Sequence, residues 1–229
     1  MHQLVRALTL TIAAAVAGPA LAQVGPTPAE AARYAGLHAA AHQGDVAQIT
    51  RLAAARADLN ARDGNGRTPL HVATFARQRE AIRALVKAGA GIDLLDNDRY
   101  DGVTIASVAD DEDTLRVLLS LGASAKQVTS RYDGTALIAA AHLGHDGVVR
   151  QLIAAGAPLD HVNNLHWTAV IESIVLGNGG ARHQATLKAL IDAKANLQLK
   201  DRQGATPLQL ARTRGYGEMV RMLEAAGAR

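Results

Sequence analysis

One apolar pattern returns six times along this 229-residue chain, and it constrains the fold more than any other feature. Each copy ends on the same position, which is occupied in turn by Arg56, Gly89, Gly122, Gly156, Lys194 and Gly227. The intervals between these positions are 33, 33, 34, 38 and 33 residues. A period of this length indicates a stack of similar supersecondary units, because one such unit cannot bury its apolar face alone.

A second pattern precedes each copy of the first and marks the start of a helix. Its fullest forms are Thr-Pro-Leu-His at residues 68–71 and Thr-Pro-Leu-Gln at residues 206–209. A threonine hydroxyl can cap the first free amides of a helix, and proline in the first turn costs no hydrogen bond. Glycine at the far end supplies the left-handed residue that stops a helix. Each repeat is therefore predicted to hold two helices. Arg56 and Lys194 replace that glycine, so strained or reshaped helix ends are expected there.

This order of motifs resembles the ankyrin repeat, in which a Thr-Pro-Leu-His turn opens one helix and a Gly-Ala end closes a second. The resemblance covers about residues 28–229. It implies an all-α ankyrin-repeat solenoid, a single domain of about six helix-turn-helix repeats with short β-hairpin or loop fingers. The repeats are expected at residues 28–60, 61–93, 94–126, 127–160, 161–198 and 199–229. Thr27 to Glu30 has the form of a capping box, so the first repeat is expected to begin directly with a helix.

The first 22 residues have the form of an export signal. Arg6 precedes an uncharged run at residues 7–18, and residues 20–22 (Ala-Leu-Ala) match the small-x-small pattern of a cleavage site. The run is too short for a comfortable bilayer span. We expect cleavage after Ala22, a short mature tail at residues 23–27 and a periplasmic location. The alternatives are an uncleaved anchor and a wrongly assigned start codon.

Composition and charge exclude several classes of site. The chain has no cysteine, which removes disulfides, thiolate metal ligands and a cysteine nucleophile. The formal net charge is only +3 and no basic stripe is visible, so a nucleic-acid partner is not expected. No phosphate loop, His-Glu-x-x-His motif or nucleophile elbow occurs. We therefore expect no enzyme activity, no metal site and no cofactor. The acidic run at residues 110–113 is expected to be a solvated helix start.

In ankyrin-like proteins, the variable binding positions are the finger tips and the exposed edge of the first helix of each repeat. Transferred to this sequence, the resemblance implies the partner-binding residues Arg67, Phe75, Arg99, Tyr100, Arg131, Tyr132, His142, Asn164 and Trp167. Aromatic and arginine side chains dominate binding hot spots. The expected anchors are therefore Tyr100, Tyr132 and Trp167. Arg99 and Arg131 are expected to pair with acidic groups of the partner.

A structural role is the alternative for several polar and aromatic positions. A tyrosine in a finger tip can simply pack on the next finger. Asp101 and Asp133 each precede a glycine and are expected to serve the finger turns. His38 and His71 occupy the Thr-Pro-Leu-His position, and His145 follows Gly144. These three histidines are expected to hold the fold together and not to bind a ligand.

The sequence thus predicts an exported monomer that recognises a partner protein non-covalently through the concave face of repeats 3 to 5, without membrane contact in its mature form. Two roles fit equally well: a scaffold or helper for a periplasmic enzyme, and an immunity-type inhibitor. The alternative is a small-molecule, haem or metal-binding protein that uses His161, His166 and His183, which lie near Glu172 and the lengthened segment at residues 176–186. A third possibility is an architectural protein without a partner.

Overall fold

The computed structural model describes residues 23–229, and the predicted export signal at residues 1–22 lies outside this range. The described chain forms thirteen helices, of which the last twelve come in six pairs. The first helices of the pairs are α2 (Gly36–Gln43), α4 (Pro69–Phe75), α6 (Gly102–Val108), α8 (Ala136–Leu143), α10 (Ala169–Val175) and α12 (Pro207–Thr213). The second helices are α3 (Val46–Ala54), α5 (Arg79–Ala88), α7 (Glu112–Ser120), α9 (Asp146–Ala154), α11 (Ala181–Asp192) and α13 (Gly217–Ala225).

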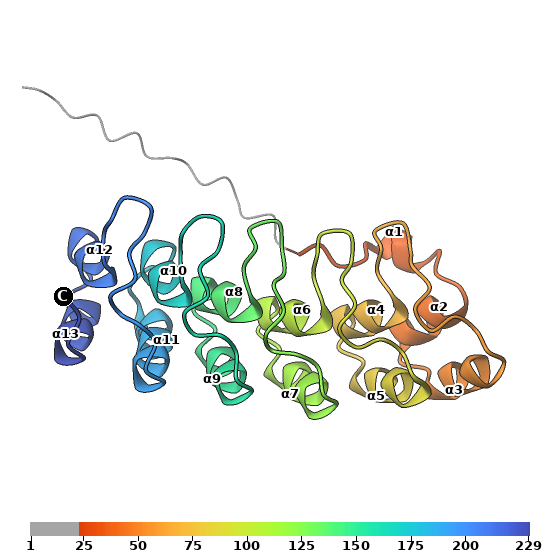
Figure 1. The fold of residues 1–229 in the computed structure, drawn as a ribbon. Helices are drawn as coiled ribbons and strands as arrows, with labels where there is room; N and C mark the ends of the chain where they lie inside the picture. The colour runs from red at the N-terminus through yellow and green to blue at the C-terminus, as the bar shows by residue number, and fades with distance from the viewer. Residues whose placement is uncertain (1–22) are drawn as a thin grey trace, which may run out of the picture.

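The helix pairs stack side by side into an elongated solenoid (Figure 1). First helices pack on first helices, and second helices on second helices, along the stack. The finger loops between successive pairs project beyond the row of first helices (Figure 1). Across residues 23–229 the fingers contain no strand, and a single isolated bridge joins Thr129 to Gly134. The all-α repeat solenoid is therefore confirmed, and its fingers are loops.

The sequence period buries the same apolar position in successive repeats. Seven residues before each periodic helix end lie the fully buried side chains of Ile49, Ile82, Leu115, Val149 and Leu187. In the sixth repeat the equivalent Val220 is half-buried. The apolar contacts therefore run between repeats, as the period predicts.

Side-chain caps fix where most of the first helices begin. Thr68, Thr135 and Thr168 each accept a hydrogen bond from the backbone N–H three residues further on. In the third repeat, Asp101 takes this position, and its carboxylate accepts from the Thr104 N–H at 2.7 Å. The expectation that Asp101 serves the finger turn is therefore wrong. Asp101 is a buried helix cap, 1% exposed.

The acidic run at residues 110–113 also contains a cap. Asp111 is buried and accepts hydrogen bonds from the backbone N–H and the hydroxyl of Thr114, at 3.1 and 2.7 Å. Burial alone would raise the pKa of Asp111, but these hydrogen bonds and the guanidinium groups of Arg77 and Arg79 outweigh it and lower the pKa. The run is therefore not a uniformly solvated helix start, because Asp111 is part of the packed structure.

Two helix ends lack the glycine that the other repeats use. Arg56 and Lys194 adopt φ angles of 60° and 69°, in the left-handed region that Gly89 occupies with φ 104°. The expected strain is confirmed, and it amounts to about 1–2 kcal/mol for each non-glycine residue. The left-handed geometry is therefore required by the repeat itself, whichever residue occupies the position.

The solenoid begins with a single helical turn, α1 (Pro28–Ala31). The predicted capping box is present: the Thr27 hydroxyl accepts from the Glu30 N–H, and the Glu30 carboxylate accepts from the Thr27 N–H at 2.7 Å. The first repeat therefore begins with a helical turn, as expected. This turn is separate from α2, which starts eight residues after Pro28, at Gly36.

The histidines with predicted structural roles bridge neighbouring repeats. Nε2 of His38 hydrogen-bonds to the carbonyl of Arg67 at 2.9 Å, and Nε2 of His71 to that of Tyr100 at 3.0 Å. Nδ1 of His145 lies 2.9 Å from the carbonyl of Ser107. Their predicted structural role is confirmed, because each ring holds the backbone of an adjacent repeat in place.

Candidate partner-binding face

Backbone hydrogen bonds join the central finger tips into a continuous row. The Ser130 N–H donates to the Arg99 carbonyl at 3.0 Å, and the Asn164 N–H donates to the Tyr132 carbonyl at 2.9 Å. The Arg202 guanidinium then donates to the Asn164 carbonyl at 2.7 Å. The tips of repeats 3 to 6 are therefore held in fixed positions before any partner arrives. We call the tips, together with the exposed edge of the first helices, the concave face.

Tyr132 is the most exposed of the predicted anchors. Its residue is 41% exposed, and the Arg131 guanidinium lies 5.6 Å from the centre of its ring, a cation–π arrangement. Asn164 adjoins them, since its side-chain amide donates to the Arg131 carbonyl at 2.9 Å. Tyr100 and Trp167 are half-buried. Arg131, Tyr132 and Asn164 thus lie together, whereas Tyr100 and Trp167 offer a partner less of their surface.

Arg99 already has an acidic partner within the chain. Its guanidinium lies 2.7 Å from the carboxylate of Asp133 in the next finger, and both side chains are about half exposed. Asp133 has a φ angle of 50°, so it occupies the left-handed turn position and its predicted turn role is confirmed. An exposed pair of this kind contributes about 0–1 kcal/mol. A partner's carboxylate can therefore replace Asp133 at little cost.

Exposed apolar side chains gather in repeats 4 and 5. Among residues 23–229, seven large apolar or aromatic residues are exposed, and five of them lie between residues 128 and 165. These five, at 37–44% exposure, are Val128, Tyr132, Leu143, Val162 and Leu165. We call them the repeat 4–5 face. Of these five, only Tyr132 is among the predicted partner-binding residues, because the prediction favoured aromatic and arginine side chains. An isolated apolar residue in a polar finger, such as Val128 or Val162, is nevertheless a visible signal.

Two predicted partner-binding residues lie under the chain's own N-terminal segment. Arg67 is 3% exposed, and its guanidinium contacts the carboxylates of Asp63 and Glu30 at 2.7 and 3.0 Å. Gly25 rests on the Phe75 ring so closely that a methyl group there would lie 3.1 Å from Cδ1. The expectation that Arg67 contacts a partner is therefore wrong, because its side chain is buried and already paired. Its charge is used inside the fold.

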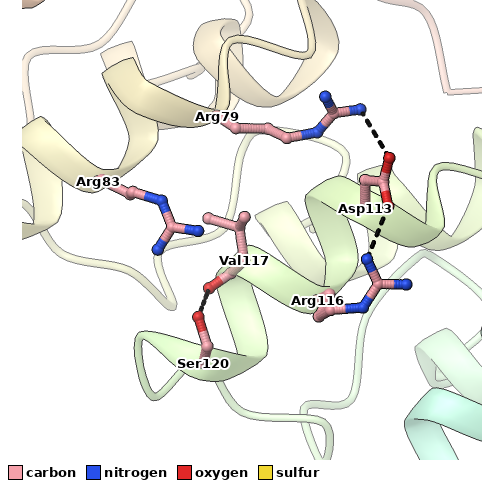
Figure 2. Close-up of a pocket in the computed structure, with 6 residues that line it drawn as sticks. All are labelled: Arg79, Arg83, Asp113, Arg116, Val117 and Ser120. Carbon is pink, nitrogen blue, oxygen red and sulfur yellow. Dashed lines mark hydrogen bonds and ion pairs between the residues drawn. The ribbon is translucent and has the colours of Figure 1, made fainter.

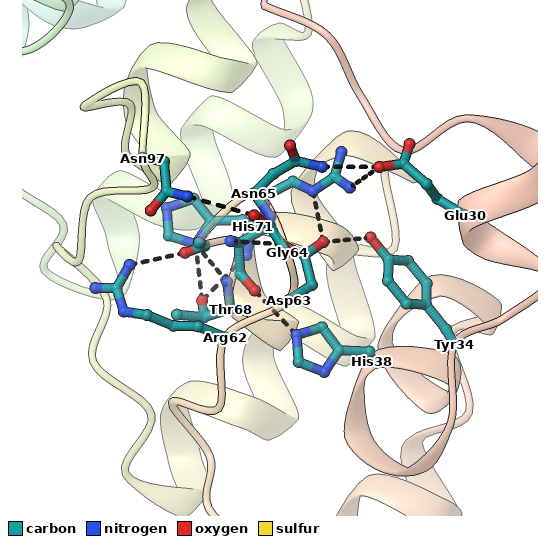
Figure 3. Close-up of polar contacts among 12 residues, drawn as sticks. Glu30, Tyr34, His38, Arg62, Asp63, Gly64, Asn65, Thr68, His71 and Asn97 are labelled. Carbon is teal, nitrogen blue, oxygen red and sulfur yellow. Dashed lines mark hydrogen bonds and ion pairs between the residues drawn. The ribbon is translucent and has the colours of Figure 1, made fainter.

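In the N-terminal polar network, formed by Glu30, Tyr34, Asp63, Asn65 and Arg67, each carboxylate has hydrogen-bond donors and a cation. The Tyr34 hydroxyl donates to the Asp63 carboxylate at 2.7 Å, and the Asn65 amide donates to Glu30 at 2.7 Å (Figure 3). Burial alone would raise the pKa of Asp63, but the hydrogen bonds from Tyr34 and Arg67 outweigh it and lower the pKa. The pKa of Glu30 falls to about 2, through its hydrogen bonds with Thr27 and the nearby Arg67. Both carboxylates thus have donors and a cation.

A second polar cluster lies in repeat 5 and has a different balance. Glu172 on α10 is 5% exposed, and its Oε1 accepts from the Asn163 side-chain amide at 2.8 Å. His142 on α8 is the nearest imidazole, with Nδ1 3.6 Å from Glu172 Oε2. Burial raises the pKa of Glu172 to about 7 against the single hydrogen bond from Asn163. We call these three residues the Glu172 cluster.

Two of the three histidines of the alternative ligand-binding hypothesis bond to neighbouring segments of the chain. Nε2 of His161 hydrogen-bonds to the Asp133 carbonyl at 2.6 Å. Nε2 of His183 hydrogen-bonds to the His142 carbonyl at 2.9 Å, and its Nδ1 to the Asn178 side chain at 3.1 Å. Between residues 23 and 229 no three His, Asp or Glu side chains form a group that could hold a metal ion. Two of the three histidines on which the ligand-binding hypothesis depended are therefore bonded within the fold, and His166 is exposed.

Two open grooves lie between second helices, away from the fingers. The groove between α5 and α7 has a volume of about 400 Å³ and is lined by Arg79, Arg83, Asp113, Arg116, Val117 and Ser120 (Figure 2). Asp113 links two of its arginines, lying 3.6 Å from Arg79 and 2.7 Å from Arg116. The groove between α11 and α13 measures about 610 Å³. In the first groove the Ser120 hydroxyl donates to the Val117 carbonyl at 2.7 Å (Figure 2).

Family models of ankyrin repeats match two stretches of the chain. A model of ankyrin repeats in many copies matches residues 37–86, and a model of three copies matches residues 137–229. In the described part of the chain, no helix is both long and apolar enough to span a membrane.

Two bacterial proteins resemble the chain over most of its length. The ankyrin repeat protein YahD of Escherichia coli K12 is 35% identical over 190 residues, which are 82% of this chain and 94% of YahD. An ankyrin repeat domain from Acinetobacter baumannii AYE is 44% identical, with a TM-score of 0.79 over 84% of this chain and 98% of that domain.

A more distant structure shares the fold alone. It belongs to the complex of the predatory endopeptidase Bd0816 from Bdellovibrio bacteriovorus with the immunity protein Bd3460. The matched chain is 24% identical, with a TM-score of 0.69 over 84% of this chain and 98% of that one. The family models, the YahD match and the stacked helix pairs agree, and the chain belongs to the ankyrin-repeat family.

Proposed function

We propose that this protein recognises a partner protein through the concave face of its central repeats and carries out no reaction itself. The observation that carries the proposal is the repeat 4–5 face: five of the seven exposed large apolar residues in the described chain gather there. Exposed apolar side chains on two neighbouring repeats, together with polar finger residues, are typical of a surface that binds a partner. The ankyrin fold is in general a non-enzymatic interaction module.

The proposed mechanism is binding to a preformed surface. Hydrogen bonds between successive finger tips fix the backbone before the partner arrives, so little conformational entropy is lost on binding. Tyr132 and Leu165 supply exposed apolar contact area, and Arg131, stacked on Tyr132, supplies a charge at the rim. The half-buried Tyr100 and Trp167 back these contacts from neighbouring fingers.

The proposal includes export and two cellular roles. The predicted export signal in residues 1–22 supports a periplasmic location for the mature chain, which we propose to be a monomer. One role is a scaffold or helper for a periplasmic enzyme, and the other is an immunity-type inhibitor. A chain of the same fold belongs to a complex between an endopeptidase and an immunity protein, which supports the second role.

The test is a pull-down from periplasmic extract with three forms of the purified protein. The first is the parent, and the second carries Tyr100→Ala, Tyr132→Ala and Trp167→Ala. The third is a matched control, Val46→Ala, which removes an equally exposed apolar residue on α3, outside the concave face. Helical circular dichroism and melting must first agree among the three. A partner retained by the parent and the control but lost by the triple variant supports the proposal, and equal retention by all three contradicts it.

A further inference from the structure

Glu172 occupies a position that is apolar in every other repeat. It lies four residues after the N-cap of its helix, Thr168. The equivalent residues in the other five repeats are Ala39, Val72, Ile105, Ala139 and Leu210. An ionisable side chain that is 5% exposed in such a register carries a desolvation cost. Its place in repeat 5 therefore calls for a specific partner group.

The finger of the same repeat has an asparagine, Asn163, where repeats 2, 3 and 6 have an aspartate. In repeats 2, 3 and 6, the finger turn is closed by Asp63, Asp96 and Asp201, whose Oδ1 accepts two backbone N–H groups. In repeat 5, Asn163 makes the same two bonds through Oδ1, both at 3.0 Å. Its side-chain amide is then free to donate to Glu172, which an aspartate could not do. The exchange of Asp for Asn and the buried acid thus form a matched pair.

The pair still leaves the charge of Glu172 without a cation. Oε2 of Glu172 accepts no hydrogen bond from residues 23–229, and the 3.6 Å separation from His142 Nδ1 is too long for one. Burial lowers the pKa of His142, and electrostatic repulsion between its protonated ring and the rings of His183 and His145 adds to this effect. His142 is therefore neutral at neutral pH and supplies no counter-charge.

The helices packed against α10 supply no other cation. The charged residue of α12, Arg212, pairs with Glu224 at 2.6 Å. On α11, Arg182 pairs with Asp110 and Asp146, and Lys188 pairs with Asp192. His183, also on α11, bonds to the carbonyl of His142 and does not contact Glu172. The negative charge of Glu172 is thus unmatched by any of these neighbours.

We propose that the Glu172 cluster binds a lysine side chain of the partner, with the ammonium group donating to Oε2. The inference rests on the proposed function, because it places this contact beside the repeat 4–5 face. One carboxylate oxygen already accepts from Asn163, so the two-pronged contact of an arginine is disfavoured and a single point charge fits better. The 28% exposed His142 side chain marks the open edge of the cluster. The long, thin stem of lysine can reach a recessed carboxylate past it.

The contact couples binding to the protonation of Glu172. An ammonium ion binds the ionised carboxylate, so binding is strongest above the pKa of about 7 of the free protein. Below it, affinity is expected to fall by up to about tenfold per pH unit. Binding must also lower the pKa of Glu172, because the cation favours the charged form.

The test uses butylammonium, which reproduces the end of a lysine side chain, as the probe. We follow the carboxyl carbon resonance of Glu172 in the purified protein by NMR at a pH above its pKa, with Trp167 fluorescence as a second readout. We expect a saturable shift and a lowered Glu172 pKa in the presence of the probe. Glu172→Gln is expected to weaken binding, followed by Trp167 fluorescence, by at least about tenfold. The control Glu112→Gln, on the outer helix α7 where Gln151 contacts this carboxylate, is expected to change nothing.

Several outcomes overturn the inference. They are no shift of the Glu172 resonance, equal binding to Glu172→Gln, and tighter binding of butylguanidinium, which would replace lysine with arginine. His142→Gln separates the two titrating groups, since a pH dependence that disappears in this variant belongs to the imidazole. A failure here is distinct from a failure of the proposed function. If only the lysine proposal fails, the pull-down still captures a partner whose binding depends on Tyr100, Tyr132 and Trp167. If only the proposed function fails, butylammonium still binds at Glu172 but the pull-down captures no such partner.

Discussion

The N-terminal network and the Glu172 cluster surround their acidic side chains with opposite sets of partners. At the N-terminus, Asp63 receives Arg67 at 2.7 Å and a tyrosine hydroxyl, and Glu30 contacts the same guanidinium. In repeat 5, Glu172 receives one neutral amide, from Asn163. The pKa of Glu30 is about 2, mainly because of its hydrogen bonds with Thr27 and then because of Arg67. Burial raises the pKa of Glu172 to about 7. The carboxylates of the N-terminal network have a cation within the chain, and the carboxylate of Glu172 has none among residues 23–229.

The two regions also differ in how much of the concave face is exposed. Where the charges are matched, the chain's own residues 23–30 cover Arg67 and Phe75. Where a charge is unmatched, the surrounding fingers expose apolar side chains, among them Tyr132 and Leu165. The same kind of repeat thus covers one surface with the chain's own residues and leaves another surface exposed.

The largest expected effect comes from removing the cation of the N-terminal network. Arg67→Ala leaves Asp63, which is 10% exposed, without its counter-charge, so the free energy of unfolding should fall by about 3–5 kcal/mol. Urea denaturation measures the loss. The control is Arg99→Ala, which breaks a half-exposed pair with Asp133 and should cost about 0–1 kcal/mol. Equal losses in the two variants would contradict the view that the N-terminal pair is buried and internal.

The next effect has the opposite sign and depends on pH. The folded pKa of Glu172, about 7, lies above its usual 4.5, so folding favours the protonated form. The parent therefore loses stability as the pH rises from 4.5 through 7, by about 3 kcal/mol in all. Glu172→Gln should be more stable than the parent above pH 7 and equal to it at low pH. Denaturation curves across this pH window check it, and a difference that does not vary with pH would count against the unmatched charge.

A third change tests the complementary exchange in the finger. Asn163→Asp keeps the two bonds to the backbone but places a second carboxylate beside Glu172, so we expect a loss of about 2 kcal/mol at neutral pH. Thermal melting at neutral and acid pH measures it, and the loss should shrink as the acids protonate. Asp201→Asn is the control in repeat 6, where Leu210 replaces the acid. If both substitutions proved harmless, the pairing of Asn163 with Glu172 would have no energetic meaning.

The smallest effect concerns one hydroxyl group of the N-terminal network. Tyr34→Phe removes the 2.7 Å hydrogen bond to Asp63 and should cost about 1 kcal/mol. Tyr132→Phe, at an exposed ring of the repeat 4–5 face, should change stability by less than about 0.5 kcal/mol. Urea denaturation compares them, and an equal response would mean that the Tyr34 bond adds nothing to the network.

The repeat architecture could be predicted from the sequence because it is encoded locally and many times. Thr68 and Thr206 cap helices at the predicted places, and the periodic helix ends take the left-handed conformation even at Arg56 and Lys194. His71 and His145 bond to neighbouring backbone as the motif implies. Each of these features depends on a few adjacent residues and on a contact that every repeat makes.

The candidate site was less predictable because it depends on contacts that only one repeat makes. The burial of Arg67 results from residues 24 to 30, roughly forty positions earlier, folding back on it. Glu172 was visible in the sequence only as an acid near histidines, and its actual partner is Asn163. That pairing could have been found by aligning the six repeats, since both residues depart from the repeat pattern together.

The most direct test of the contrast is a carbon-detected NMR titration of the Glu30 and Glu172 carboxyl groups in one sample of the free protein. We predict a pKa of about 2 for Glu30 and of about 7 for Glu172. Values near 4.5 for both carboxyl groups would contradict the account, because Glu172 would then need no cation from a partner.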